Sequence, residues 1–226
     1  MPHIPPKQVP REFVEAAVSQ TLWDLGDQVL YDLFRAHPEH KEDQVIIAKI
    51  WLLGRAYAAP IERGKTRADP AGRVFYETAL APAIRNSSID AWFQEIRNAA
   101  PYDLPVHLEV HRRVMDLFKQ ISGIERRSLA SQYLHFHFPE RFFIHHSRAV
   151  TALSQLTKRS GPPPEHLGLN NPDHRYARFF LRAESLRGQL STLLGRQITP
   201  RQLDNVLLSY TPPKKRKRNR PSKPLP

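Results

Sequence analysis

The chain contains no cysteine, and this absence excludes several kinds of chemistry together. Disulfide bonds, thiolate zinc sites, iron–sulfur clusters and cysteine nucleophiles all require the thiol group. No apolar run approaches the roughly 18 residues that a membrane-spanning helix needs. The first ten residues, MPHIPPKQVP, carry prolines where a signal peptide would have its apolar segment. We therefore expect a soluble intracellular protein without a membrane partner: cytoplasmic or nucleoid-associated in a bacterium, nuclear in a eukaryote.

The chain also has fewer acidic residues than basic ones. Its formal net charge is +12, and seven of these charges lie in residues 214–223, which contain no acid. We expect the whole segment 212–226 to be a disordered basic tail that binds nucleic-acid phosphates without reading sequence. A nuclear import signal and a solubilising extension are the alternatives. The remaining chain, with a net charge of +5, is only mildly basic. The candidate DNA-binding residues of the tail are Lys214, Lys215, Arg216, Lys217 and Arg218.

The apolar residues recur at helical spacing, and no segment alternates with the period of a strand. The pattern predicts an all-α fold, with an extended arm at 1–10 and a single helical domain at 11–211. Asp103 is expected to cap a helix that has Pro105 in its first turn, and Ser87 or Ser88 another. Loops are expected at 64–70 and 159–173. The predicted helices cover 11–37, 43–59, 71–81, 88–98, 104–120, a segment from about 125, 149–156, 176–194 and 203–210.

The segment ISGIERR at 121–127 has the features of an anion site. A glycine between two apolar residues lets the backbone approach a phosphate closely, and the following helix start supplies free N–H groups. Arginine at a helix start is disfavoured by the helix dipole, so a pair of them there favours an anionic partner. The candidate DNA-binding residues here are Ser122, Gly123, Arg126 and Arg127, with Arg148 further along.

Histidines are frequent in the next stretch, SLASQYLHFHFPERFFIHHSRAV, which raises the possibility of a metal site. His135 and His137 would point apart by about 200° on a helix, which weakens the pair as joint ligands. No carboxylate stands at a ligand-like spacing. The sequence predicts no metal and no cofactor. A metal-dependent hydrolase would require at least three histidines to converge with an acid.

These two segments, in this order and spacing, resemble the helix-hairpin-helix DNA glycosylases of the HhH-GPD-like superfamily. I-S-G-I-E-R-R-S-L-A, within a hairpin at about 104–137, corresponds to the L-P-G-V-G hairpin of that family. F-F-I-H-H-S-R-A-V, within 139–157, corresponds to its V-D-T-H-V-like site. The resemblance covers roughly residues 104–157. It implies a DNA-binding protein that hydrolyses the N-glycosidic bond of a damaged or modified base, in repair or in defence against modified foreign DNA.

The sequence departs from the family at the residues that carry its chemistry. Glu125 replaces the second glycine of the hairpin, and Arg127 stands where bifunctional members keep a lysine. A guanidinium cannot form a Schiff base, so the resemblance implies a monofunctional enzyme. The essential aspartate of the family falls at His145 or His146, either of which could act as a general base. Glu62 and Glu125 are the candidates for the missing acid.

The candidate base pocket draws on two stretches. Phe142 and Phe143 combine aromatic rings with nearby cations, which favours a flipped base, although packing in the core is the alternative. Arg55 and Tyr57 lie with Glu62 in IWLLGRAYAAPIERG, where small residues permit close backbone approach. The alternative there is a helix contact with a solvated ion pair. For the whole protein, the alternative function is a non-catalytic module that binds DNA or RNA.

Overall fold

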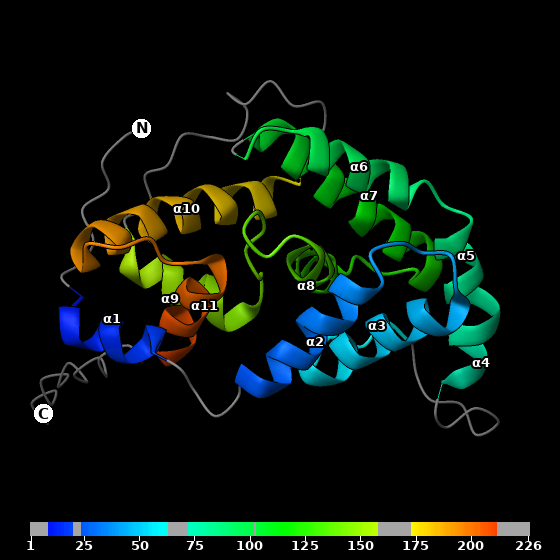
Figure 1. Ribbon diagram of the computed structural model, residues 1–226, viewed down its shortest axis with the longest axis horizontal. Coiled ribbons are helices and arrows are strands. Elements are labelled where there is room, and N and C mark those ends of the chain that lie inside the picture. The colour runs from blue at the N-terminus through cyan, green and yellow to red at the C-terminus, as the bar shows by residue number, and fades with distance from the viewer. Residues whose placement is uncertain (1–8, 20–23, 63–71, 102, 158–172, 212–226) are drawn as a thin grey trace, which may run out of the picture.

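A computed structural model of the chain describes residues 9–19, 24–62, 72–101, 103–157 and 173–211, and every element within them is helical (Figure 1). The predicted all-α class is confirmed for these ranges, and none of their helices is long and apolar enough to cross a bilayer. In chain order the elements are α1 (Arg11–Val18), α2 (Asp24–Ala36), α3 (Asp43–Ala56), α4 (Arg73–Phe75), the π-helix η1 (Tyr76–Leu80), α5 (Ala81–Arg85), α6 (Ile89–Asn98), α7 (Leu104–Ser122), α8 (Arg127–His137), α9 (Ser147–Leu156), α10 (His174–Leu194) and α11 (Pro200–Ser209).

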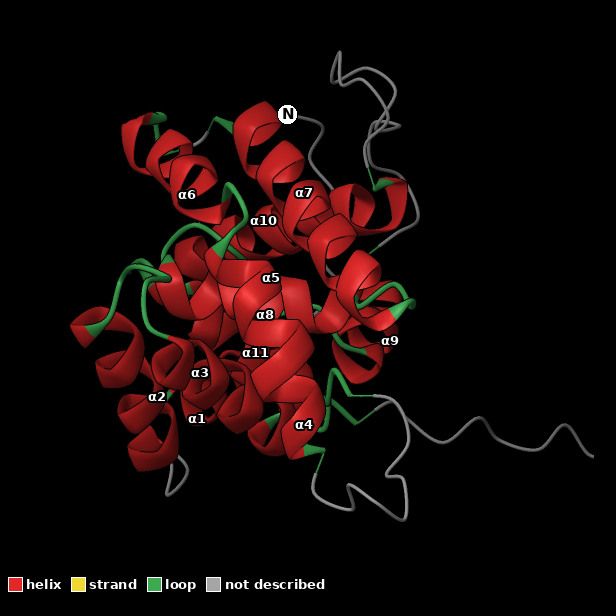
Figure 2. Cartoon of the chain, turned by 90° about the vertical axis from the view of Figure 1, so that its right-hand side faces the viewer, coloured by secondary structure: helices red, strands yellow, loops and turns green. Residues whose placement is uncertain are grey.

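Helix α8 lies at the centre of the fold (Figure 2). Every residue from Leu129 to Phe136 is buried, whereas a surface helix would bury only one face. The helix packs against α7, α2 and α3. Burial on all sides explains why the aromatic residues of this stretch belong to the core. Helix α8 is half-buried only at its two ends, at Arg127 and Ser128 and at His137, and the turn before it, at 123–125, is exposed.

Local sequence signals place several helix starts correctly. Asp103 accepts a hydrogen bond from the Val106 N–H at 3.4 Å, and Pro105 occupies the first turn of α7, as predicted. At α6, Ser88 is the N-cap residue, but the Ser87 hydroxyl accepts the Ile89 N–H at 3.3 Å. The boundaries of α9, α10 and α11 lie within a few residues of the predicted ones.

The first half differs more from the prediction. The segment from Arg11 to Pro38 contains two helices rather than one, because α1 ends at Val18 and Ser19 is extended. Helix α3 ends at Ala56, three residues before the predicted end. Ala58 there adopts a positive φ of 50°. Pro60 disfavours helical geometry in the residue before it, so the chain turns back onto α3.

The predicted helix at 71–81 is a longer unit, formed by α4, η1 and α5 in succession. A π-helix is uncommon and is often found at functional positions. Here it begins at Tyr76, whose hydroxyl donates to the Glu62 carboxylate at 2.5 Å. The predicted loop at 64–70, nearly all of the predicted loop at 159–173, the tail at 212–226 and most of the N-terminal arm lie outside the described residues.

Candidate nucleic-acid interface

Three segments that are far apart in the sequence line one polar pocket of about 300 Å³ at the exposed end of α8. We call it the α8 pocket. The chain beyond α3 contributes Ala58 and Ala59, and the segment before α9 contributes His145. The hairpin contributes the largest share, with Glu125, Arg126, Arg127, Ser128 and Leu129. The candidate hairpin, the candidate site segment and the stretch at 50–64 therefore meet at this position.

The turn before α8 leaves the start of that helix open to a ligand. Gly123 closes α7 with a positive φ of 73°, which explains the requirement for glycine. Arg126 is the N-cap residue of α8, and no side chain of the described residues caps the free N–H groups there. Ser122 is buried, and its hydroxyl donates to the Phe118 carbonyl at 2.7 Å. The predicted role of Ser122 in contacting DNA is therefore corrected: its side chain holds the turn.

The two arginines of the pocket differ in how they are held. Arg126 donates from Nη2 to the Ile61 carbonyl at 3.0 Å, while its buried Nε has no partner in the described part of the chain. Arg127 donates from Nε to the Asp173 carboxylate and lies 3.4 Å from Glu125. The charge of Arg127 is thus largely balanced within the protein, so Arg126 is the better donor to an external anion.

Asp173 is a site residue that the sequence interpretation placed in a loop. Its carboxylate caps α10 by accepting the N–H groups of Arg175 and Tyr176, at 3.1 and 3.4 Å. Burial raises the pKa of Asp173, but the bond from Arg127 and the other charges outweigh this effect, and the pKa is lowered. The carboxylate is therefore ionised and fixes Arg127 at the wall of the α8 pocket.

His145 is the histidine of the pair that lines the α8 pocket. Burial, helped by the Arg127 charge, lowers its pKa to about 4, so the imidazole is neutral near pH 7. Its Nδ1 atom is buried and has no hydrogen-bond partner within the described ranges. The Phe179 ring lies edge-on at 4.9 Å, and the Ser131 hydroxyl accepts the backbone N–H at 2.9 Å. A neutral imidazole held in place can exchange a proton with a bound ligand.

His146 faces a different environment, and both of its ring nitrogens are engaged. Nδ1 accepts the Ala149 N–H at 3.2 Å and caps α9. Nε2 then carries the proton and donates to the buried Asp204 carboxylate at 2.9 Å. With no free lone pair, this imidazole is poorly suited to deprotonate a water. We therefore assign His146 a structural position, and His145 is the better candidate for a general base.

The bond from His146 leads into a partly buried ionic network that joins four parts of the chain. Arg201 of α11 lies between two carboxylates, 2.5 Å from Asp204 and 2.5 Å from Asp27 of α2. Tyr57 donates to Asp27 at 2.8 Å, and the Arg201 guanidinium lies 5.9 Å from the centre of its ring. Tyr57, a predicted base-pocket residue, thus belongs to this network, and Asp27, Arg201 and Asp204 are members that the sequence interpretation missed.

The other half of the predicted pocket wall forms a separate cluster. Arg55 lies 2.7 Å from Glu62, which also accepts from Tyr76. Burial raises the pKa of Glu62, but the hydrogen bonds from Tyr76 and Arg55 outweigh it and lower the pKa. Glu62 is therefore a held, ionised carboxylate outside the lining of the α8 pocket. Of the two candidate acids, Glu125 is the one that lines the pocket.

Phe142 and Phe143 are buried, and their predicted role as a base-stacking pair is corrected. Phe142 packs against the His107 and Phe138 rings, and Phe143 packs edge-on against Phe180 at 4.9 Å. Their rings belong to the hydrophobic core because the extended segment 142–146 runs between helices. The core alternative is the observed one.

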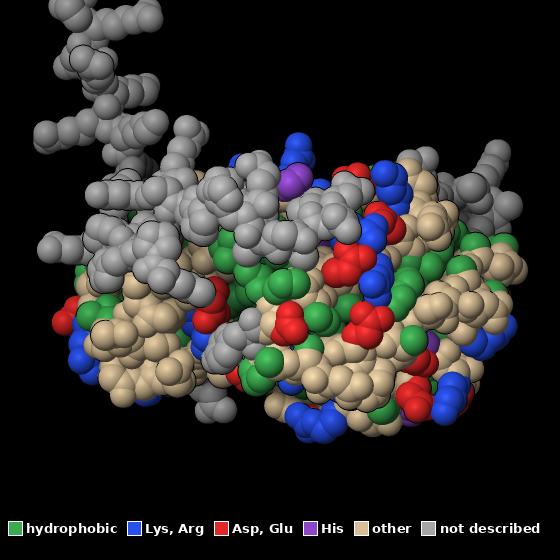
Figure 3. All heavy atoms as spheres, turned by 90° about the horizontal axis from the view of Figure 1, so that it is seen from above, with side chains coloured by type: hydrophobic (Ala, Val, Ile, Leu, Met, Phe, Trp, Pro, Cys, Tyr) green, Lys and Arg blue, Asp and Glu red, His purple; other side chains and the backbone are tan. Residues whose placement is uncertain are grey.

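The remaining predicted cations do not form one patch with the hairpin. Arg148 is exposed, donates to the Leu208 carbonyl at 2.9 Å and lines a separate groove between α9 and α11. The tail residues Lys214–Arg218 lie outside the described residues. Figure 3 shows acidic and basic side chains interspersed over the face seen from above, which agrees with a mildly basic domain.

No group of three or more metal-ligating side chains comes together within the described ranges. His135 and His137 point apart, as the helical period predicts. His135 is bonded to the Tyr31 hydroxyl at 2.6 Å, whereas His137 faces Lys49 at 3.5 Å. Comparisons with protein-family models, with curated proteins and with solved structures find no match to this chain.

Proposed function

We propose that this chain is a DNA-binding protein that grips the phosphate backbone at the α8 pocket and excises a base there. One observation carries the proposal: the hairpin, the segment before α9 and the chain beyond α3 line a single polar pocket at an uncapped helix start. A volume of about 300 Å³ lies at the lower end of the range for small-molecule sites. The pocket therefore suits one nucleotide unit rather than a large ligand.

Backbone binding combines two kinds of donor with an open turn beside them. The free N–H groups of the α8 start and the positive end of its dipole favour an anion. Arg126 adds a guanidinium with an unpaired Nε. Gly123, exposed and without a side chain, lets a phosphate approach the turn. These contacts are independent of base identity, so we expect affinity to depend strongly on salt.

Base excision, in the same proposal, is centred on His145. Its neutral imidazole accepts a proton from a water whose oxygen attacks C1′ of the sugar. The N-glycosidic bond breaks, its electron pair leaves with the base, and the base takes up a proton from solvent. Glu125, at the pocket wall, is the carboxylate available to stabilise positive charge on the sugar. Arg127 cannot form a Schiff base, so hydrolysis would leave an intact abasic strand.

Binding is tested by fluorescence anisotropy of the full chain with a duplex oligonucleotide at several salt concentrations. Arg126→Gln should weaken binding and reduce the slope of log affinity against log salt by about one. Arg175→Gln is the matched control, because Arg175 is exposed on α10 and does not line the pocket. The tail is present in all variants and contributes equally. Equal losses in the two variants would contradict the proposal.

Excision is tested separately, by alkali cleavage of duplexes that carry a panel of damaged or modified bases. His145→Asn should abolish abasic-site formation while DNA affinity is retained. His146→Asn should keep activity, since that imidazole is engaged on both sides. If no base in the panel is released although Arg126→Gln weakens binding, the chain is a non-catalytic DNA-binding module.

A further inference from the structure

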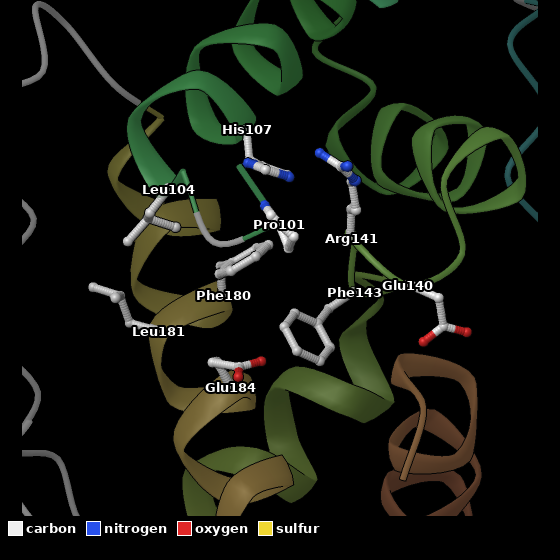
Figure 4. A pocket seen from close by; sticks show the side chains of 9 residues that line it. All are labelled: Pro101, Leu104, His107, Glu140, Arg141, Phe143, Phe180, Leu181 and Glu184. Carbon is white, nitrogen blue, oxygen red and sulfur yellow. The ribbon is translucent and has the colours of Figure 1, made fainter. Parts of the chain in front are cut away.

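A second pocket, distinct from the α8 pocket, lies between the start of α7 and the middle of α10 (Figure 4). Its volume is about 70 Å³. The walls are apolar and come from Leu104, Phe143, Phe180 and Leu181. The Phe143 and Phe180 rings meet edge to face, with centroids 4.9 Å apart and planes at 77°. We call it the His107 pocket, after the buried imidazole at one side.

His107 supplies a hydrogen-bond acceptor without a protein partner. Its side chain is almost fully buried, with a relative exposure of 1%. Nδ1 lies 2.5 Å from the Asp103 carbonyl oxygen, which can only accept, so Nδ1 carries the proton. Nε2 is therefore the lone-pair nitrogen, and it is buried with no hydrogen-bond partner among the residues that the structure describes. An acceptor left unpaired in this way costs about 1–3 kcal/mol unless a ligand donates to it.

The other polar groups near the pocket are donors, paired carboxylates or exposed. Arg141 donates from Nη1 to the Ile96 and Ala99 carbonyls at 2.6 and 3.0 Å, and a guanidinium cannot accept a hydrogen bond. Glu184 is bonded by Arg187 through both of its oxygens. Glu140 is exposed. Among the described residues that line the pocket, His107 Nε2 is thus the buried hydrogen-bond acceptor without a partner.

We propose that the His107 pocket binds a small phenol, whose ring lies against Phe143 and Phe180 and whose hydroxyl donates to His107 Nε2. A dry apolar cavity of about 150 Å³ takes up benzene. A pocket of about half that volume takes the hydroxyl-bearing end of the ring and leaves the opposite end at its mouth. The hydroxyl end of the phenol must enter the pocket first, because the His107 Nε2 acceptor is buried. A ring without a hydroxyl donor would leave this acceptor unpaired. This site is independent of DNA binding.

The test uses the full chain without DNA and two probes of similar size, phenol and toluene. Isothermal titration should show phenol binding about tenfold tighter than toluene, since only phenol satisfies the acceptor. In nitrogen-15 spectra of the histidine rings, phenol should shift Nε2 of His107. His107→Phe should remove the preference for phenol. Leu181→Trp, at a half-buried position, should block both probes.

His174→Phe is the control, because His174 is exposed on α10 and should leave phenol binding unchanged. Equal affinity for toluene and phenol overturns the proposal, as does phenol binding without a shift at Nε2, or no phenol binding at all. If His107→Phe does not fold, the shift in the unsubstituted chain decides the question. Failure of this test leaves the DNA-binding proposal untouched, because the two use different pockets and different ligands.

Discussion

Lowering the pH from 7 to 5.5 should destabilise the fold by at least about 5 kcal/mol, because burial lowers the pKa of six histidines, His40, His107, His111, His135, His137 and His145. Burial is the largest cause for each of them. It lowers the pKa of His40, His135 and His145 to about 4 and that of His111 to about 3. His111 shows the reason clearly, since it is fully buried and stacked on Tyr176 at 3.5 Å.

The direction of the effect follows from proton counting. In the unfolded chain each histidine has a pKa near 6.5 and binds a proton between pH 6.5 and 4, while the folded chain does not. Stability is therefore complete above about pH 6.5 and is lost as the pH falls towards the folded values. Each of the four groups with a folded pKa of about 3 or 4 contributes about 1.2 kcal/mol between pH 7 and 5.5, and His107 and His137 add to this loss. The total is comparable to the whole stability of many domains, which is about 5–15 kcal/mol.

Urea unfolding followed by circular dichroism at a series of pH values measures this loss. His111→Phe keeps a ring against Tyr176 but removes one titrating group, so the variant should lose about 1 kcal/mol less over the same interval. His174→Phe, at an exposed position, should behave as the unsubstituted chain does. The reasoning is refuted if the unfolding free energy falls by less than about 2 kcal/mol, or if His111→Phe shows the full loss.

Three further changes have defined outcomes. Raising the pH from 8 to 9.5 should stabilise the protein by about 1.5 kcal/mol, because burial lowers the pKa of Lys49 to about 8 and the folded chain releases a proton that the unfolded chain keeps. Urea unfolding of Lys49→Met should lack this rise. Ala58→Gly should leave the unfolding free energy unchanged or raise it by up to about 1 kcal/mol, since glycine accepts the positive φ freely; a lower thermal midpoint would contradict this. His146→Ala should cost about 1–2 kcal/mol through the lost cap of α9 and leave duplex affinity intact; a large fall in affinity would place His146 at the DNA.

The parts of the fold that the sequence predicts are those set by local interactions. Asp103 and Pro105 mark the start of α7, and the spacing of apolar residues marks the lengths of α10 and α11. Both signals are local, because a helix cap and an amphipathic face depend on residues that are close together in the sequence. The break after Val18 has no comparable signal, since apolar residues on both sides keep a helical spacing. The end of α3 depends on Pro60 folding back onto Gly54, where an added Cβ would lie 3.1 Å from the Pro60 Cα.

The candidate site could be predicted only in pieces. The hairpin and the histidine pair are visible as segments, but their meeting with Ala58 and Ala59 depends on tertiary packing. Arg127 and Asp173 are 46 positions apart, and nothing local pairs them. Asp204 did carry a signal. It lies among the apolar positions of the last helix, and an acid on a buried face requires a partner.

The central position of α8 determines which part of the protein a bound ligand stabilises. A ligand at the open end of this helix contacts the element against which α2, α3 and α7 are packed. Its binding free energy therefore adds to the opening free energy of the core rather than to that of a peripheral loop. Binding should therefore slow the hydrogen exchange of the core amides by a factor of about one plus the ratio of ligand concentration to Kd. The occupancy of the pocket can then be measured at amides that are far from the ligand.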